Sequence, residues 1–307
     1  MEPKDAEAEG GGESKPEWLS GVSTNLSYGD EDFSSPNIES GSSSQPPFLQ
    51  RAQSVAIIIS LLLSPVAVIL VAMWANDLGG VSWEEGESKQ VFNWHPVLMI
   101  CAYAFMNVGS LIFRVTATSG YHASMRSEQD ASPHSPTTYI NQKKRGIVKL
   151  SHASIWSLSI IFGIVAMLAV FKSHNDPVNG YIANLYSFHS WVGVLVLSIY
   201  TLQFLVGVMA FGGLLSNNRV RSPLVLEIHK YTGTYLHMLV TATIMLGIME
   251  KEGFVGCGYD VEEADLMPFK NFGKIPGVCK ISHFLGLTVL AMGIFTSFGL
   301  ARFPVLK

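Results

Sequence analysis

Four histidines occupy the same unusual place in the chain, because each lies within the first two turns of a long apolar stretch. They are His95, His152, His189 and His229. An ionisable side chain at the edge of hydrocarbon is costly unless another group binds it, so each imidazole needs a partner. Imidazoles in such places ligate metal ions or relay protons, and these four residues are the first candidates for function.

The apolar stretches that carry these histidines are long enough to cross a membrane. Of the 307 residues, 48% are apolar and only 14% are charged, whereas a soluble domain has about 25% charged residues. The apolar residues gather in blocks, and a membrane-spanning helix needs about 20 residues. We predict helices over residues 52–75, 93–114, 149–171, 186–211, 223–249 and 281–301. The fold class is therefore an all-α polytopic membrane protein with six transmembrane helices.

The remaining segments are polar and flank or connect these helices. Residues 1–50 are rich in Gly, Ser, Pro and acids and have no apolar period, so we predict a disordered tail. Its acids argue against a signal or transit peptide. Residues 51–303 form the six-helix domain, and 304–307 form a short C-terminus. The longer connections predicted as loops are 115–148, 172–185 and 250–279.

Basic residues indicate which side of the membrane each loop occupies, since Lys and Arg are enriched in cytosolic loops. The loops after the second and fourth helices hold a clear excess of them. These residues are Arg126, Lys143, Lys144, Arg145, Arg219 and Arg221. We therefore place these two loops, and with them both termini, in the cytosol.

Composition also excludes some functions. No basic patch points to nucleic acid, and three cysteines make neither a disulfide framework nor a zinc site.

Cys257 and Cys279 lie in or beside the non-cytosolic loop after the fifth helix. That compartment is usually oxidising, which favours a disulfide between them. Cys101 lies inside the second helix, where a cysteine acts as a small apolar residue.

The alternating direction of successive helices sorts the histidines into two pairs at equal depth. His95 and His189 open the second and fourth helices, so both lie near the non-cytosolic face. His152 and His229 open the third and fifth helices and lie near the cytosolic face. Imidazoles from two parallel helices can grip a flat iron macrocycle, which predicts two haems with two axial histidines each. Such haems carry electrons, and the two irons should lie roughly 20 Å apart along the membrane normal.

Glycines follow two of these histidines at the next turn of the helix. Gly193 lies four residues beyond His189, and Gly233 lies four residues beyond His229. Residues four apart share a helix face, so these glycines leave room for the edge of a ring. Glycine also allows helices to pack closely in membranes, which is the alternative explanation.

At these residues the chain resembles the cytochrome b561 family of ascorbate-dependent transmembrane di-haem reductases. The matching stretches are FNWHPVLM at 92–99, KLSH at 149–152, LYSFHSW at 185–191, HKYTG at 229–233, LGIMEK at 246–251 and LGL at 285–287. The likeness covers residues 55–301 and implies that helices 2–5 form a central four-helix bundle holding two haems b. It also implies electron transfer from cytosolic ascorbate to a non-cytosolic acceptor, either monodehydroascorbate or a ferric chelate.

The resemblance further implies where the substrates bind. Family members hold ascorbate with basic residues near the end of helix 2 and the start of helix 3, and Arg114 and Lys149 occupy those places here. A histidine before helix 4 lies near the acceptor, and His174 is the candidate. The expected location is the plasma membrane or an endomembrane, such as a vacuolar, lysosomal or vesicle membrane. The sequence leaves the oligomeric state open, and a homodimer is one option.

Several alternatives stay open at this point. A quinol-linked di-haem subunit of a larger redox complex, or a proton-coupled transporter with histidine relays, would also use intramembrane histidines. Arg114 and Lys149 would equally serve as interfacial anchors whose charged ends reach the headgroups. His237 lies two turns beyond His229 and is interpreted as a hydrogen-bonded helix residue. His283 has no partner at its depth and is interpreted as structural.

Overall fold

Six long helices make up most of the chain that the computed structural model describes, which comprises residues 46–116, 136–212, 223–257 and 275–301. They are α1 (Pro47–Asp77), α2 (Ser88–Thr116), α4 (Pro136–His174), α5 (Phe188–Phe211), α6 (Pro223–Val255) and α7 (Gly277–Leu300). Between α4 and α5, β1 (Asn175–Asp176) pairs with β2 (Gly180–Tyr181) in an antiparallel turn. Each helix contains a stretch long and apolar enough to cross a membrane, which confirms the predicted fold class.

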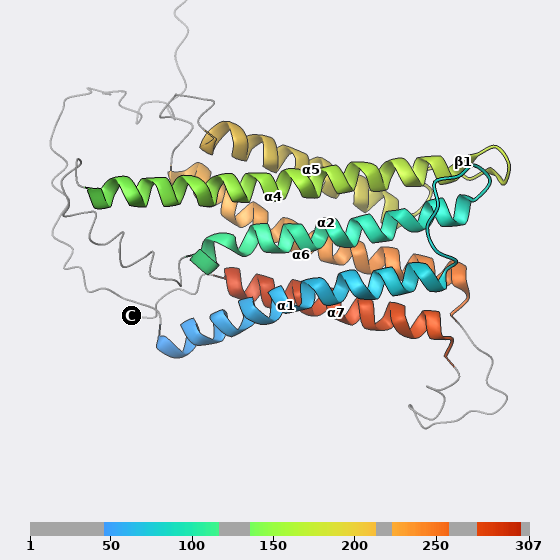
Figure 1. The fold of residues 1–307 in the computed structure, drawn as a ribbon, viewed down its shortest axis with the longest axis horizontal. Coiled ribbons are helices and arrows are strands. Elements are labelled where there is room, and N and C mark those ends of the chain that lie inside the picture. Colours follow the sequence, from blue (N-terminus) through green and yellow to red (C-terminus); the bar gives the residue numbers. More distant parts are fainter. Residues whose placement is uncertain (1–45, 117–135, 213–222, 258–274, 302–307) are drawn as a thin grey trace, which may run out of the picture. The chain divides into compact units, whose positions relative to one another are not determined.

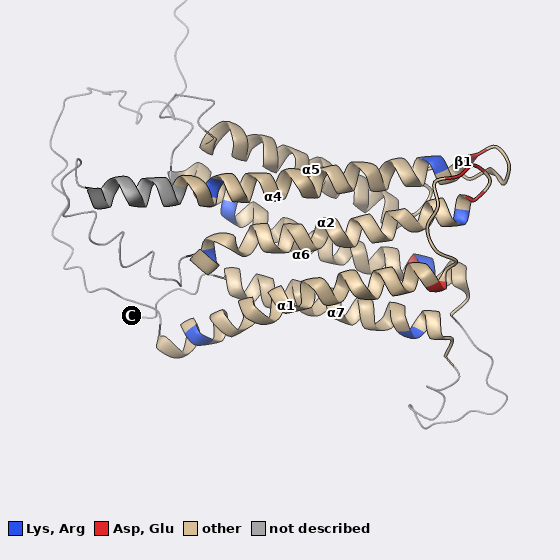
Figure 2. Cartoon of the chain, in the orientation of Figure 1, with Lys and Arg blue, Asp and Glu red and all other residues tan. Residues whose placement is uncertain are grey.

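The helices lie side by side along one direction (Figure 1). α2 packs along α4, α5 packs along α6, and α1 packs along α7. The α2–α4 pair and the α5–α6 pair touch each other much less than the helices within each pair do. Charged residues of the described helices gather near the two ends of the bundle (Figure 2), as expected for helices that cross hydrocarbon.

Several predicted helix boundaries are wrong, and three of the errors have one cause. α1 begins at Pro47, inside the predicted tail. α4 begins at Pro136, inside the connection predicted over 115–148. α6 ends at Val255, inside the loop predicted over 250–279. Charged and amide residues mark the end of an apolar span, but Glu, Lys, Arg and Gln favour helix, so these helices continue beyond the span.

A disulfide closes the segment between α6 and α7. Cys257 Sγ lies 2.10 Å from Cys279 Sγ, which confirms the predicted pairing. Beside it, Glu252 accepts a hydrogen bond from Ser282 Oγ, and its Oε1 lies 3.4 Å from Nε2 of His283. His283 thus has a structural partner, in agreement with its interpretation. The following predicted features lie outside the described residues: the tail up to residue 45, Arg126, Arg219 and Arg221.

One carboxylate ties the α1–α2 connection to the turn between β1 and β2. Asp176 Oδ2 accepts hydrogen bonds from Asn179 Nδ2 (2.9 Å) and Gly86 N (3.2 Å), and Oδ1 accepts one from Val178 N (2.9 Å). These bonds, the one from Asn179 foremost, lower the pKa of the Asp176 carboxyl. The carboxylate therefore stabilises the fold above the ordinary pKa of aspartate, and this contribution is lost as the pH falls through the lowered pKa.

A buried amide joins α2 to the two outer helices. Asn107 Nδ2 donates to Ser60 O (3.2 Å) and Ser64 Oγ (2.9 Å) of α1. Thr296 Oγ1 of α7 donates to Asn107 Oδ1. Asn107, Ser60 and Thr296 are fully buried. Hydrogen bonds between helices satisfy polar groups that have no water to bind in hydrocarbon, so this cluster fixes α1 and α7 against α2.

Replacing the carboxylate of Asp176 should destabilise the folded protein at neutral pH and reduce the acid sensitivity of its stability. Asp176→Asn removes the charge that the backbone N–H groups favour. Thermal unfolding in micelles, followed between neutral pH and about pH 3, gives the comparison. A variant whose unfolding temperature depends on pH as steeply as that of the wild type would contradict this role.

Replacing Asn107 should lower the free energy of unfolding by about 1–3 kcal/mol, because Asn107→Ala removes interhelical hydrogen bonds and leaves buried hydroxyls without a partner. Denaturant-induced unfolding in detergent micelles measures the change. Ser198→Ala is the control, since the exposed hydroxyl of Ser198 bonds only Val194 O of its own helix. Equal stabilities for the two variants would show that the amide does not hold the outer helices.

Candidate functional site

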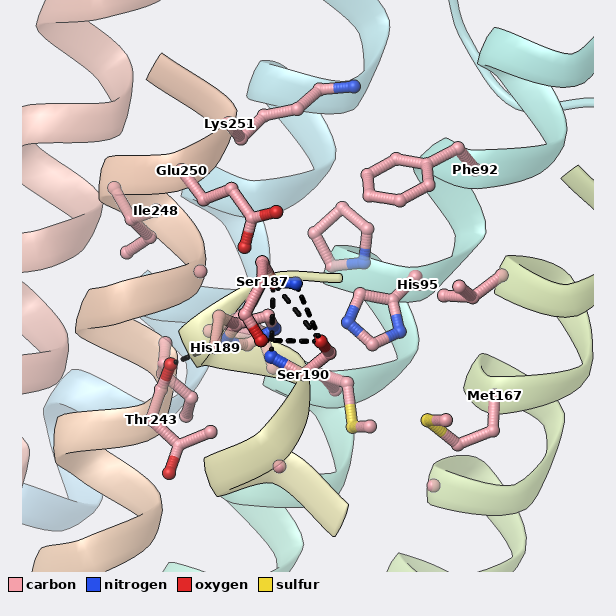
Figure 3. A pocket seen from close by; sticks show the side chains of 18 of the residues that line it. Phe92, His95, Met167, Ser187, His189, Ser190, Thr243, Ile248, Glu250 and Lys251 are labelled. Atoms are coloured by element: carbon pink, nitrogen blue, oxygen red, sulfur yellow. Dashed lines mark hydrogen bonds between the residues drawn. The ribbon is translucent and has the colours of Figure 1, made fainter. Parts of the chain in front are cut away.

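His95 of α2 and His189 of α5 approach each other inside the bundle (Figure 3). Their ring centroids lie 6.1 Å apart, and the ring planes are inclined at 80°. A bond between a metal ion and an imidazole nitrogen is about 2 Å long, so two rings that ligate one ion from opposite sides have centroids about 6 Å apart. The separation of these rings therefore fits one metal ion between them.

His152 of α4 and His229 of α6 repeat this arrangement, with ring centroids 6.5 Å apart and planes inclined at 68°. The structure thus brings together the same two pairs that the helix directions predicted. We call the two regions of the bundle the His95 end and the His152 end. His95 approaches the carbonyl of Ala166, fourteen residues after His152 on α4. The pairs are therefore about 21 Å apart along the helix axis, close to the expected spacing.

Backbone carbonyls determine which ring nitrogen carries the proton in three of the four imidazoles. The contacts join His189 Nδ1 to Thr243 O (3.0 Å), His152 Nδ1 to Gly109 O (2.8 Å) and His95 Nδ1 to Ala166 O (3.4 Å). A carbonyl only accepts hydrogen bonds, so Nδ1 carries the proton and Nε2 keeps a lone pair for a metal ion. The buried Nδ1 of His229 has no hydrogen-bond partner within the described part of the chain.

Two glycines make room for imidazoles that come from the neighbouring helix. A Cβ at Gly247 of α6 would lie 2.8 Å from Cε1 of His189. A Cβ at Gly207 of α5 would lie 3.1 Å from Cε1 of His229. Each of these helices therefore supplies a histidine and also the glycine that accommodates the histidine of the other. The sequence analysis missed both glycines, because a single sequence does not say which residue faces a side chain across a helix pair.

A cavity of about 740 Å³ surrounds the first pair, within the range of about 300–1,000 Å³ that is typical of cofactor and ligand sites. Helices α2, α4, α5 and α6 all contribute to its lining, which is mainly apolar and includes Met99, Met167 and Ile244. Gly193 borders the cavity, and a Cβ there would meet no atom within 4 Å, so Gly193 leaves the space that was predicted for a ring edge. A Cβ at Gly233 would make an ordinary 3.5 Å contact with Gln203 Nε2.

His174, the residue predicted to lie near the acceptor, is at the His95 end and borders the same cavity. It is only 8% exposed, and its Nδ1 lies 3.1 Å from Asn184 Oδ1. Its ring stacks on Phe92, with centroids 6.3 Å apart and planes inclined at 7°. The structure therefore brings His174 to the predicted end of the bundle, and its contact with an acceptor stays a prediction.

The cavity mouth also holds charged and phenolic groups, two of which the sequence analysis placed in a loop. Lys251 Nζ lies 4.5 Å from the centroid of the Phe92 ring, which makes a cation–π contact. Glu250 and Tyr186 border the cavity as well. Burial raises the pKa of the Tyr186 phenol, and the nearby carboxylate of Glu250 raises it further. These groups make the His95 end both aromatic and polar.

Arg114 and Lys149, the predicted ascorbate contacts, both lie towards the His152 end. Arg114 Nη2 donates to Leu300 O (3.0 Å) and Ala301 O (3.3 Å) at the C-terminus of α7. Cations stabilise the carbonyl end of a helix, so Arg114 has a structural contact that the sequence did not predict. Lys149 is exposed on α4. Contact of either residue with a substrate stays a prediction.

His237 lies between the two pairs along α6 and is fully buried. Its Nε2 lies 3.4 Å from the hydroxyl of Tyr103, and the two rings stack with centroids 5.1 Å apart. Tyr103 also shares a 2.7 Å hydrogen bond with Thr241. The interpretation of His237 as a hydrogen-bonded helix residue is confirmed.

Comparison with known proteins places this arrangement in a family. The sequence model for eukaryotic cytochrome b561 matches residues 133–255. A plasma membrane ascorbate-dependent reductase of Xenopus laevis is 32% identical over 239 residues, which cover 77% of this chain and 71% of that protein. A lysosomal membrane ascorbate-dependent ferrireductase of Danio rerio is 29% identical over 78% of this chain and 84% of its own length. A transmembrane ascorbate ferrireductase of Arabidopsis thaliana is 28% identical over 64% of this chain and 71% of its own length. This chain belongs to the cytochrome b561 family.

Proposed function

We propose that this protein is an ascorbate-dependent transmembrane oxidoreductase that passes electrons through two haems b, each held by two histidines. The observation that carries the proposal is the presence of two imidazole pairs, 6.1 Å and 6.5 Å between centroids, near opposite ends of one bundle. The names of the relatives supply the donor class, since they are ascorbate-dependent reductases and ferrireductases.

The residues at the His95 end fit a haem by three independent criteria. Neutral imidazoles offer Nε2 lone pairs from two sides. The 740 Å³ cavity between them is mainly apolar, as the porphyrin face requires. Gly193 leaves its side of the cavity open, and Gly247 allows His189 its position. At the His152 end, His152 and His229 repeat the ligand spacing, and Gly207 repeats the clearance.

The chain's own residues prepare each site for electron transfer rather than for oxygen chemistry. A bound haem supplies the one-electron redox chemistry. His95 with His189, and His152 with His229, would each hold one haem by two imidazoles, and a haem held in this way would carry electrons rather than bind oxygen. The carbonyls of Thr243, Gly109 and Ala166 hold three of the rings in the orientation and tautomer that ligation needs. Apolar walls keep water away from the cavity at the His95 end.

The direction of transfer follows from the proposed orientation, in which the His152 end is cytosolic. Ascorbate gives up one electron and a proton there, beside Arg114 and Lys149, and becomes monodehydroascorbate. The electron leaves at the His95 end, near His174, and reduces either monodehydroascorbate or a ferric chelate. The relatives are plasma membrane or lysosomal proteins. We propose one of these membranes as the location, with termini in the cytosol and a homodimer as the assembly to test.

Replacing one histidine of each pair should remove one haem at a time. His189→Ala should lose the haem of the His95 end, and His229→Ala should lose that of the His152 end. Optical spectra of the purified protein, titrated with ascorbate, measure both occupancy and reduction. His283→Gln is the control, since His283 binds Glu252 outside both sites. Unchanged spectra in both variants would refute haem ligation and favour a transporter with histidine relays. Reduction by quinol but not by ascorbate would favour a quinol-linked subunit.

Filling the space beside His189 should disturb the haem of the His95 end alone. Gly247→Val places side-chain atoms where even a Cβ lies 2.8 Å from the imidazole, so His189 must leave its position. The expected result is loss of about half the haem per protein, because the other pair is untouched, measured by pyridine haemochrome content. Gly253→Val is the matched control on the same helix, as a Cβ at Gly253 meets nothing within 4 Å. Full occupancy in Gly247→Val would contradict the packing argument.

A further inference from the structure

Two lysines at the His95 end line one cavity, which among the described acids only Glu250 also borders. Lys89 of α2 and Lys251 of α6 both line the 740 Å³ cavity that contains His95 and His189. Neither ammonium forms an ion pair with any described carboxylate. The described contact of Lys251 Nζ is with the Phe92 ring. Lys251 is partly buried, and its charge interacts repulsively with that of Lys89.

This arrangement is unfavourable in the protein alone. Two like charges at the edge of a low-dielectric region repel each other, and the half-buried ammonium of Lys251 also loses hydration. Lys89 also lies in the first turn of α2, where the helix dipole is already positive and a cation is destabilising. Such positive potential without compensation is favourable where an anion binds.

Glu250, the acid that borders the cavity, forms no ion pair with either ammonium group. Glu250 precedes Lys251, but Figure 3 shows its carboxylate directed towards Ser187, whereas Lys251 extends past Phe92. The charge of Glu250 acts instead on the phenol of Tyr186. Asp176, the buried acid of the β1–β2 turn, is bound to Asn179 and to backbone N–H groups. Among the residues that line the cavity, the two lysines therefore outnumber the one carboxylate.

We propose that Lys89 and Lys251 form an anion site at the mouth of this cavity, which takes a carboxylate group. The inference rests on the proposed function, because that function supplies two sources of carboxylate. One is a propionate of the haem held by His95 and His189. The other is a carboxylate-rich ferric chelate that arrives as acceptor, beside the stacked rings of Phe92 and His174. In both cases Lys251, the more buried ammonium, makes the stronger contact.

The decisive variant is Lys251→Gln, with Lys251→Arg to restore the charge. Lys172→Gln is the matched control, because Lys172 lies in the last turn of α4 at the same end but does not line the cavity. Holoprotein in lipid nanodiscs is measured in two ways. Spectroelectrochemical titration without acceptor gives haem occupancy and midpoint potential. Stopped-flow reoxidation of the reduced protein compares anionic ferric citrate with cationic hexaammineruthenium(III).

Each source of carboxylate gives a distinct result. If the anion is a propionate, Lys251→Gln lowers the midpoint potential or the occupancy of one haem, and Lys251→Arg restores it. If the anion is the acceptor, occupancy and potential stay at wild-type values, while reoxidation by ferric citrate slows about tenfold at low ionic strength. Reoxidation by hexaammineruthenium(III) then keeps its wild-type rate.

Three results would overturn the anion site. One is wild-type behaviour of the Lys89→Gln, Lys251→Gln double variant in every measurement. Another is equal slowing with both oxidants at an unchanged potential. The third is an equal effect of Lys172→Gln, which would indicate surface charge in general. A wild-type protein without any haem would instead refute the proposed function, so the two failures are distinguishable.

Discussion

The proposed haem sites depend on holding two imidazoles from different helices about 6 Å apart, between ring centroids, inside the bundle. Helices in direct contact have axes about 8–10 Å apart, which leaves no room for two inward-pointing rings and a group between them. The chain meets this constraint by packing α2 on α4 and α5 on α6, while the two pairs touch each other much less. Each histidine pair then spans the two halves, with His95 and His152 on one and His189 and His229 on the other. The cavity at the His95 end is thus a product of how the helices are paired.

Electrostatics imposes the second condition, because a charged imidazole is costly at this depth. Burial keeps the ring neutral, and donation of Nδ1–H to a carbonyl selects the tautomer whose Nε2 lone pair would be free to bind a metal ion. Gly109 shows how the backbone supports this, since its carbonyl accepts from His152. A Cβ at Gly109 would also lie 2.7 Å from Nε1 of Trp156, so this one glycine serves both the hydrogen bond and the packing of α2 on α4.

The sequence predicts much of this structure, and its failures have physical causes. Apolar length predicts the six spans, because it is a property of each helix by itself. The alternating direction of successive helices predicts the histidine pairs, because that direction follows from the number of spans. The start of α4 at Pro136 was missed because helix continues where hydrophobicity ends. Gly207 and Gly247 were missed because their function depends on which neighbour faces them. Lys251 was missed because it lies past the end of the apolar span. It was also missed because the residues it faces, Phe92 and Lys89, belong to another helix, α2.

The α2–α4 pair and the α5–α6 pair must also be kept apart, and α7 is positioned to do so. It packs against both α6 and α2. Close approach to α6 requires Gly293, where a Cβ would lie 2.7 Å from Thr241, and α1 approaches through Gly299 in the same manner. The disulfide from Cys257 to Cys279 fixes one end of α7 to α6, and Arg114 binds the carbonyls at its other end to α2. Close packing through small residues gives membrane helices a defined geometry that lipid contacts alone do not. α7 therefore helps to hold α2 and α6 at their distance, so the protein itself contributes to the spacing of the histidine pairs.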